Sequence, residues 1–362
     1  MPTLRAFHGI RYADATALKD LTCPPYDVIS PARQDELYAR DDHNAVRLEL
    51  PRGGDDRYAV AGETFTEWRR DDILVRDERA SLYVYRQDFV DDTGARRRVT
   101  GVIGALELEE FGTSSGVLPH EKTMPGPKKD RLALMTALPV NVSPIFAIYR
   151  GKGALTSFFE ALEDRDPDAR FADDSGILHR LWVVSAPAEV ELLSGAVTPG
   201  PLVIADGHHR YETALEFARQ DERPGTRSIM CFCVDADPEE LVVLPYNRAV
   251  RGDAVDVGST LVERFGGAEV PDPVAAAQKL PTGGTHPFVA VLPDRSLRAE
   301  IDDVRVVART GPRHEAWLAL DVVALHEGVL PELFPAGIED VRFSKEPDEI
   351  VRLVRDEGFT AG

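Results

Sequence analysis

The stretch of sequence that decides the fold is PLVIADGHHRYETALEFAR, residues 201–219. Residues 201–205 are apolar and partly β-branched, which predicts a buried strand. Residues 212–219 are rich in helix formers with apolar side chains at helical spacing, which predicts a helix. Gly207 permits a tight turn between the two elements. Because the N–H groups and the dipole at the start of a helix favour negative charge, we expect this turn to bind a phosphate.

The side chains of this turn add chemistry to the backbone. Arg210 suits a phosphate, and the neighbouring His208 and His209 add imidazoles that can act as donors or proton carriers. We predict that Asp206, His208 and His209 are catalytic and that Gly207 and Arg210 hold the phosphates. The alternative is an ordinary Asp-Gly turn whose histidines satisfy backbone groups. A zinc site is disfavoured, because adjacent histidines diverge whereas a helical site needs them about four residues apart.

A second charged loop, LPHEKTMPGPKKDR, covers residues 118–131 and precedes a predicted helix that ends near Leu138. Three of the seven lysines fall within eight positions of this loop, in a chain that otherwise prefers arginine. Lysine is a compact, mobile point charge that suits a polyphosphate, and the Pro and Gly residues suggest a lid or clamp. The alternative is a solvated basic loop. We predict nucleotide contacts from His120, Glu121, Lys122, Lys128, Lys129 and Arg131.

Two further segments carry candidate residues, CPPYDVIS at 23–30 and HNAVRLELP at 43–51. Asp27 would either bind Mg²⁺ or accept a substrate proton, or it would only cap a turn after two prolines. Polar and apolar residues alternate over 43–49, which predicts a half-buried strand with Arg47 and Glu49 on one face. These two would form a surface ion pair, or Arg47 would bind a substrate carboxylate while Glu49 acts as the base. We assign to the substrate Tyr26, Asn44, Arg47 and Arg248.

These four motifs, in the order in which they follow one another along the chain, resemble the bacterial and archaeal family catalogued as domain of unknown function ten-fifteen, over Phe7 to about Val250. Residues 206–210 alone are similar to the phosphate-binding turn of ParB partitioning proteins, sulfiredoxins and free-serine kinases. That local resemblance implies a bound ATP or ADP, with CTP as an alternative, and a ParB/sulfiredoxin-like core with large additions. The chain departs from the family at Asn247, where members often have histidine in a Pro-Thr-His-Arg-like stretch. It also contains no Met-Pro-x-Lys-Ser-Thr segment of the kind with which members commonly end.

Composition narrows the classes of partner. With 42 basic and 62 acidic residues the formal net charge is −20, so the surface repels nucleic acid and anionic lipid, and any phosphate site is a local island. No apolar run approaches the roughly 20 residues that span a bilayer. The three cysteines, Cys23, Cys231 and Cys233, form no disulfide framework. We therefore expect a cytoplasmic protein that binds neither nucleic acid nor membrane.

The spacing of strand and helix signals predicts an α+β fold with mixed sheets and flanking helices. Residues 82–90 and 97–108 are predicted to form a hairpin around the turn signal at 91–94, and Ser30 is predicted to cap a helix over 31–38. The Asp-rich stretch 164–176 is the expected boundary between an N-terminal α+β domain, residues 1–165, and a C-terminal α+β domain, residues 166–362.

The function predicted from these observations is transfer of a phosphoryl group to a small hydroxylated metabolite. The turn at 206–210 would hold the nucleotide phosphates, and Lys122, Lys128 and Lys129 would neutralise charge on the transferring group. Glu49 or Asp27 would deprotonate the acceptor, and Mg²⁺ would bridge phosphate oxygens. Two alternatives remain open: a nucleotide-responsive binding module without turnover, and a hydrolase that uses one of the paired histidines.

Overall fold

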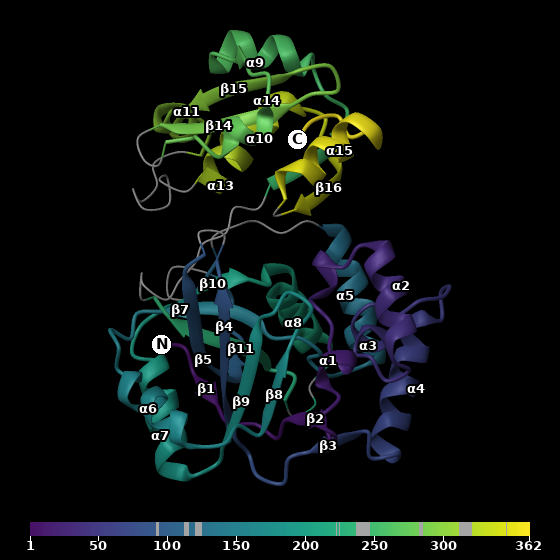
Figure 1. Ribbon diagram of the computed structural model, residues 1–362, viewed down its shortest axis with the longest axis vertical. Helices are drawn as coiled ribbons and strands as arrows, with labels where there is room; N and C mark the ends of the chain where they lie inside the picture. Colours follow the sequence, from purple (N-terminus) through teal and green to yellow (C-terminus); the bar gives the residue numbers. More distant parts are fainter. Residues whose placement is uncertain are drawn as a thin grey trace. The chain divides into compact units, whose positions relative to one another are not determined.

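The computed structural model describes residues 1–91, 94–111, 116–119, 125–221, 223, 225–236, 247–281, 285–310, 321–344 and 346–362, with only the backbone at 125–127, 303 and 310. The chain divides into two compact units, Met1–Val242 and Val243–Gly362 (Figure 1). Both units contain helices and strands, which confirms the α+β class.

A large mixed sheet organises the first unit. Within the described residues it has nine strands in the order β6-β10-β7-β11-β5-β4-β9-β8, and β1 also pairs with β5. The strands are β1 (Leu4–Arg5), β4 (Leu82–Val90), β5 (Arg96–Glu107), β6 (Val117–Leu118), β7 (Ile145–Tyr149), β8 (Ala169–Ala172), β9 (Leu178–Val184), β10 (Leu202–Asp206) and β11 (Ser228–Asp235). The pairs β10–β6 and β11–β7 are parallel, whereas the other pairs are antiparallel. The predicted β4–β5 hairpin is confirmed.

Helices and a small ribbon complete this unit. The helices are α1 (Leu18–Leu21), η1 (Tyr26–Val28), α2 (Pro31–Arg40), α3 (Val46–Glu49), α4 (Arg57–Arg70), α5 (Pro125–Ala137), α6 (Thr156–Ala161), η2 (Leu162–Asp164), α7 (Pro187–Val197) and α8 (His208–Gln220), and the ribbon pairs β2 (Ile10–Tyr12) with β3 (Leu74–Arg76). The predicted cap is confirmed, since the Ser30 side chain accepts a hydrogen bond from the Arg33 N–H and Pro31 begins α2.

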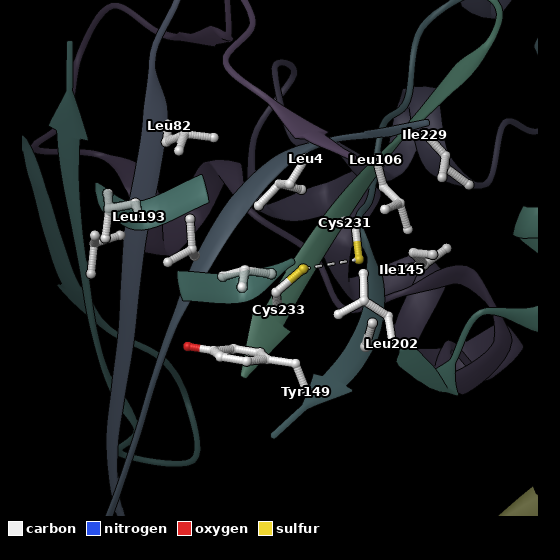
Figure 2. Close-up of a cluster of buried hydrophobic side chains, with 14 of the residues drawn as sticks. Leu4, Leu82, Leu106, Ile145, Tyr149, Leu193, Leu202, Ile229, Cys231 and Cys233 are labelled. Carbon is white, nitrogen blue, oxygen red and sulfur yellow. Dashed lines mark hydrogen bonds between the residues drawn. The ribbon is translucent and has the colours of Figure 1, made fainter. Parts of the chain in front are cut away.

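The main hydrophobic core lies on one face of the large sheet. Strand residues such as Ile145 and Leu202 pack there with Leu193 of α7 (Figure 2), and Tyr211 of α8 belongs to the same cluster. Cys231 and Cys233 point into the same core from β11, and their Sγ atoms are 3.5 Å apart. Both cysteines are fully buried free thiols, as expected of small core residues.

The second unit has its own sheets and core. β12 (Asn247–Gly252) pairs with β16 (Ile338–Ser344), and β15 (Ser296–Ile301) lies between β13 (Ala268–Glu269) and β14 (His286–Val291). Its described helices are α9 (Val257–Phe265), α10 (Pro273–Ala277), α11 (Asp303–Thr310), α13 (Asp321–Val323), the π-helix η3 (Ala324–Val329), α14 (Leu330–Leu333) and α15 (Pro347–Asp356). Leu261 and Val306 are among its fully buried core residues.

Two expectations differ from the structure. The predicted boundary at 165/166 lies inside the first unit, because β9, β10 and β11 pair with strands that precede it. The Asp-rich stretch 164–176 contains β8, which pairs with β9. The predicted strand at 43–49 is wrong: Val46–Glu49 is the helix α3, and the Asn44 side chain accepts a hydrogen bond from the Val46 N–H at its start. Among the described helices, none is both long and apolar enough to cross a bilayer.

Candidate functional site

The backbone at Asp206–Arg210 has the predicted strand–turn–helix form. β10 ends at Asp206, Gly207 adopts φ +92° and ψ 27°, and α8 begins at His208. This left-handed conformation favours glycine. A Cβ atom at position 207 would also lie 2.8 Å from Cγ2 of Ile145 on β7, so the turn excludes a side chain by contact as well as by conformation.

A bulge in β10 sets the direction of Asp206. The register pairs Ile204 with Ala147 but Asp206 with Phe146, so one extra residue of β10 is accommodated between them. Ile204 is fully buried in the core, whereas 55% of the Asp206 side chain is exposed. The bulge therefore turns Asp206 away from the core, where strict alternation would have placed its carboxylate beside Ile204.

Arg210 is held by the protein on two of its three nitrogens. Its Nη2 donates to the carboxylate of Asp206, and its Nη1 donates to the carbonyl of Pro144 and, at 3.3 Å, to the hydroxyl of Ser143. The residue is 8% exposed, and its buried Nε has no hydrogen-bond partner among the described residues. These contacts tie the start of α8 to the start of β7, so Arg210 orients Asp206 and positions the turn.

The two histidines differ in burial. His208 is 1% exposed, whereas His209 is half-buried, and both lie in the first turn of α8. The N-cap residue of this helix is Gly207, which has no side chain with which to cap it. His209 is therefore the imidazole with surface to offer a ligand at this helix start.

A second loop brings Asp27 to the same place. Asp27 lies in η1, and although it is exposed, nearby protein desolvates its carboxylate and raises its pKa. The carboxylate of Asp206 raises this pKa further, Glu49 adds a smaller effect of the same sign, and Arg210 opposes them. Asp27 thus lies within electrostatic reach of Asp206, Glu49 and Arg210.

Glu49 is a buried support for the loop that carries Asp27. It is 3% exposed, and its Oε1 accepts hydrogen bonds from the Tyr26 backbone N–H at 3.3 Å and from the Ser143 hydroxyl at 3.0 Å. Burial raises the pKa of the nearby Cys23 thiol, and the charge of Glu49 raises it further. Glu49 therefore has the contacts of a positioning residue.

Arg131, on α5, locks the other side of Tyr26. Its guanidinium lies 4.1 Å from the Tyr26 ring centroid, donates to the Glu49 carbonyl at 2.8 Å and pairs with Asp130 at 2.6 Å. Desolvation, followed by the charge of Asp27, raises the pKa of Tyr26 to about 12. Arg131 is 6% exposed, so it is a buried structural residue that supports the Tyr26 loop.

The lysine-rich segment lies beside the histidine turn. α5 packs along α8, and the Nζ atom of Lys128 is 2.5 Å from Oε2 of Glu212, one helical turn after His208. Lys129 is exposed. Two segments far apart in the sequence thus place cationic and imidazole side chains on neighbouring helices. The predicted contacts of His120, Glu121 and Lys122 lie outside the described residues.

The residues assigned to the substrate are placed differently. Asn44 is fully buried and donates to the carbonyls of Asp20 and Thr22, so it organises the loop before α3. Arg47 does not share a face with Glu49 on a strand; it bonds Asp42 at 2.8 Å and stacks on Tyr38. Arg248 belongs to β12 of the second unit, where its guanidinium lies over the ring of Phe343.

The sequence did not mark Ser143 or Asp130. Ser143 donates to Glu49 and accepts from Arg210, which makes it the link between the two motifs. Asp130 accepts from Tyr58 and Arg131, which outweigh its desolvation and lower its pKa. A Ser-Pro pair directly before a strand was the only signal for Ser143, and it is too common to predict a site.

The oxygen donors suit magnesium better than zinc. Over the described ranges, no three His, Cys, Asp or Glu side chains gather as a metal site. Mg²⁺ commonly takes one or two carboxylates and completes its shell with water and substrate phosphates. Asp27 and Asp206, whose carboxylates interact electrostatically, are the residues that could hold such an ion.

The family described as "Protein of unknown function (DUF1015)" matches residues 4–323, a range that includes all four motifs. No curated protein and no solved structure matches the chain.

Proposed function

The chain belongs to this family, and we propose that it is a nucleotide-binding phosphotransferase that acts on a small hydroxylated metabolite. The observation that carries the proposal is the approach of Asp27, from a separate loop, to Asp206 at the glycine turn that begins α8. The turn offers a helix N-terminus to an anion, and the loop offers a carboxylate to a substrate hydroxyl.

The phosphates would bind at the first turn of α8. Gly207 lets them approach the backbone because no Cβ covers the turn. His209 and Lys128 would supply the flanking donors, since His209 lies in the first turn of α8 and Lys128 of α5 pairs with Glu212 in the next turn. ATP or ADP is the proposed nucleotide, with CTP as the alternative that the same turn would accept.

Asp27 is the proposed base, in preference to Glu49. Its raised pKa brings it closer to neutral pH, where a carboxylate accepts a proton more effectively, and it is exposed. Glu49 is buried and already accepts two hydrogen bonds. The acceptor proton would pass to Asp27 while the acceptor oxygen bonds the terminal phosphorus and the bond to the nucleoside diphosphate or monophosphate breaks.

Mg²⁺ would neutralise phosphate charge when bound with the nucleotide. With Asp27 occupied as the base, Asp206 is the carboxylate left for this ion. Arg210 holds Asp206 in place through its charged hydrogen bond.

The test is to incubate the pure protein with ATP, ADP or CTP, Mg²⁺ and a pool of hydroxylated metabolites, and to identify phosphorylated products by mass spectrometry. Asp27→Asn should reduce transfer by about 10²- to 10⁴-fold, the usual range for a lost general base. Glu49→Gln keeps an acceptor oxygen for Tyr26 and Ser143 and should reduce it by far less. Asp42→Asn, at a 93% exposed surface carboxylate, is the matched control and should have no effect.

Other outcomes would identify the alternatives. Free phosphate released regardless of acceptor would indicate a hydrolase. Saturable nucleotide binding without turnover would indicate a binding module, a function favoured by the observation that Arg210 and Arg131 are both engaged by the protein itself. No nucleotide binding at all would contradict the proposal.

A further inference from the structure

A continuous row of aromatic rings crosses the large sheet. Phe146 stacks on Phe232 with centroids 5.6 Å apart, and Phe232 meets the edge of Tyr85 at 5.4 Å. Tyr85 then stacks on His179 at 5.9 Å, and His179 on Phe171 at 4.6 Å. We call Phe146, Phe232, Tyr85, His179 and Phe171 the aromatic row. It joins side chains from β7, β11, β4, β9 and β8.

A glycine keeps the row continuous. β5 lies between β11 and β4, and its residue opposite Tyr85 is Gly101. A Cβ atom there would be 2.6 Å from Cε2 of Phe232. Any side chain at this position would therefore push the Phe232 ring away and separate it from Tyr85.

The aromatic row lies on the sheet face opposite the aliphatic core. Ile145 and Ala147, the neighbours of Phe146 along β7, are fully buried core residues, and side chains alternate between the faces of a strand. No member of the row belongs to a hydrophobic core cluster of the described residues. Phe146, Tyr85 and Phe171 are half-buried, so part of their ring surface remains available.

The row begins at the proposed phosphate site. Phe146 is the register partner of Asp206, and residues directly opposite in a pair share a face of the sheet. The bulge that turns Asp206 away from the core therefore turns it toward the face of the aromatic row.

We propose that Phe146, backed by Phe232, stacks against the base of the nucleotide. This inference rests on the proposed function and specifies the part of the ligand that the turn at 206–210 does not bind. A nucleotide joins a polyanion to a planar ring, and the structure offers a helix N-terminus and an aromatic ring on neighbouring strands. An aromatic ring suits this role because every nucleotide base has a π-face that can stack on it.

The test compares ligands with and without a base by isothermal titration calorimetry. The wild-type protein should bind ATP about ten- to a hundredfold more tightly than tripolyphosphate or ribose 5-triphosphate, the gain expected of one ring–base stack. Phe146→Leu should remove most of that difference and leave tripolyphosphate affinity unchanged, which also shows that the variant is folded. Phe146→Tyr keeps the ring and should keep the difference.

Phe171→Leu is the matched control, because it makes the same change at the far end of the aromatic row and should not alter ATP affinity. Equal wild-type affinity for ATP and ribose 5-triphosphate would overturn the inference while leaving the phosphate site intact. So would an unchanged preference for ATP in Phe146→Leu. Binding of neither ATP nor tripolyphosphate would instead remove the proposed function, and this inference with it.

Discussion

The turn at Asp206–Arg210 and the segment at Asn44–Glu49 supply charged residues to the same site in opposite ways. The turn holds its own charges: Asp206 and Arg210 pair across one helical turn, and Asp206 remains half exposed. The segment separates its charges: Glu49 is buried against Tyr26 and Ser143, whereas Arg47 bonds Asp42 at the surface. A charged side chain is thus a structural support where protein surrounds it, and it is available to a ligand only where one side stays open.

The largest expected difference between the two regions is at their arginines. Arg210→Ala would leave the Pro144 carbonyl and the Asp206 carboxylate without their donor, and should lower the free energy of unfolding by about 3 kcal/mol. Arg47→Ala should cost less than about 1 kcal/mol, because its partner Asp42 is 93% exposed. Urea denaturation of both variants measures the difference. Equal losses would contradict the contrast drawn between the two regions.

A smaller difference is expected at the backbone of the turn. Gly207→Ala would place a methyl group in the left-handed region and 2.8 Å from Ile145, and should cost about 2–3 kcal/mol. Gly176→Ala, in the β8–β9 turn, has a similar φ of +77°, but no atom of the residues that the structure describes lies within 4 Å of its Cβ, so it should cost only about 1 kcal/mol. Thermal unfolding of the two variants separates the cost of the left-handed backbone from the cost of the close contact with Ile145. A Gly207→Ala variant no less stable than Gly176→Ala would show that the turn adapts.

The smallest effect is expected where the two regions meet, at Asp27. Because its folded-state pKa is raised, the ionised carboxylate destabilises the native state, and the penalty is fully present only above that pKa. Asp27→Asn should therefore raise the melting temperature at pH 7–8, and the gain should fade as the pH drops through the raised pKa toward the ordinary value near 4. The gain from Asp27→Asn should be smaller in a protein that already carries Asp206→Asn, since the charge of Asp206 contributes to the raised pKa of Asp27. A gain that persists at low pH would mean that desolvation and charge are not its cause.

The sequence predicted best where one residue sets the local conformation. Gly207 with its left-handed φ, and Ser30 with Pro31 at the start of α2, gave correct elements because the causes lie within a few residues. The segment at 43–49 was misjudged for the opposite reason. Its alternation suits a strand, but the Asn44 side chain turns the chain into a helix, and burial of Val46 and Leu48 against two separate clusters of side chains completes it.

Long-range pairing limited the prediction of the site. The boundary expected near residue 165 was wrong because β10 and β11 pair with β7, which precedes that boundary. Asp206 and Ser143 therefore belong to one unit. Asp27 carried a sequence signal of its own, whereas Ser143 and Phe146 carried none, because they resemble any residues at the start of a strand. Their roles depend on register and on the β10 bulge, which local sequence does not encode.

The buried thiols on β11 have a practical consequence. Cys231 and Cys233 lie on β11, between β7 and β5 of the large sheet, and burial raises the pKa of Cys231 well above that of an exposed thiol. A thiolate-directed reagent would therefore modify them only when the sheet opens. The rate of their alkylation thus reports how often this unit opens. A nucleotide that binds at the end of β10 would lower this alkylation rate without contacting either sulfur, because it stabilises the closed sheet.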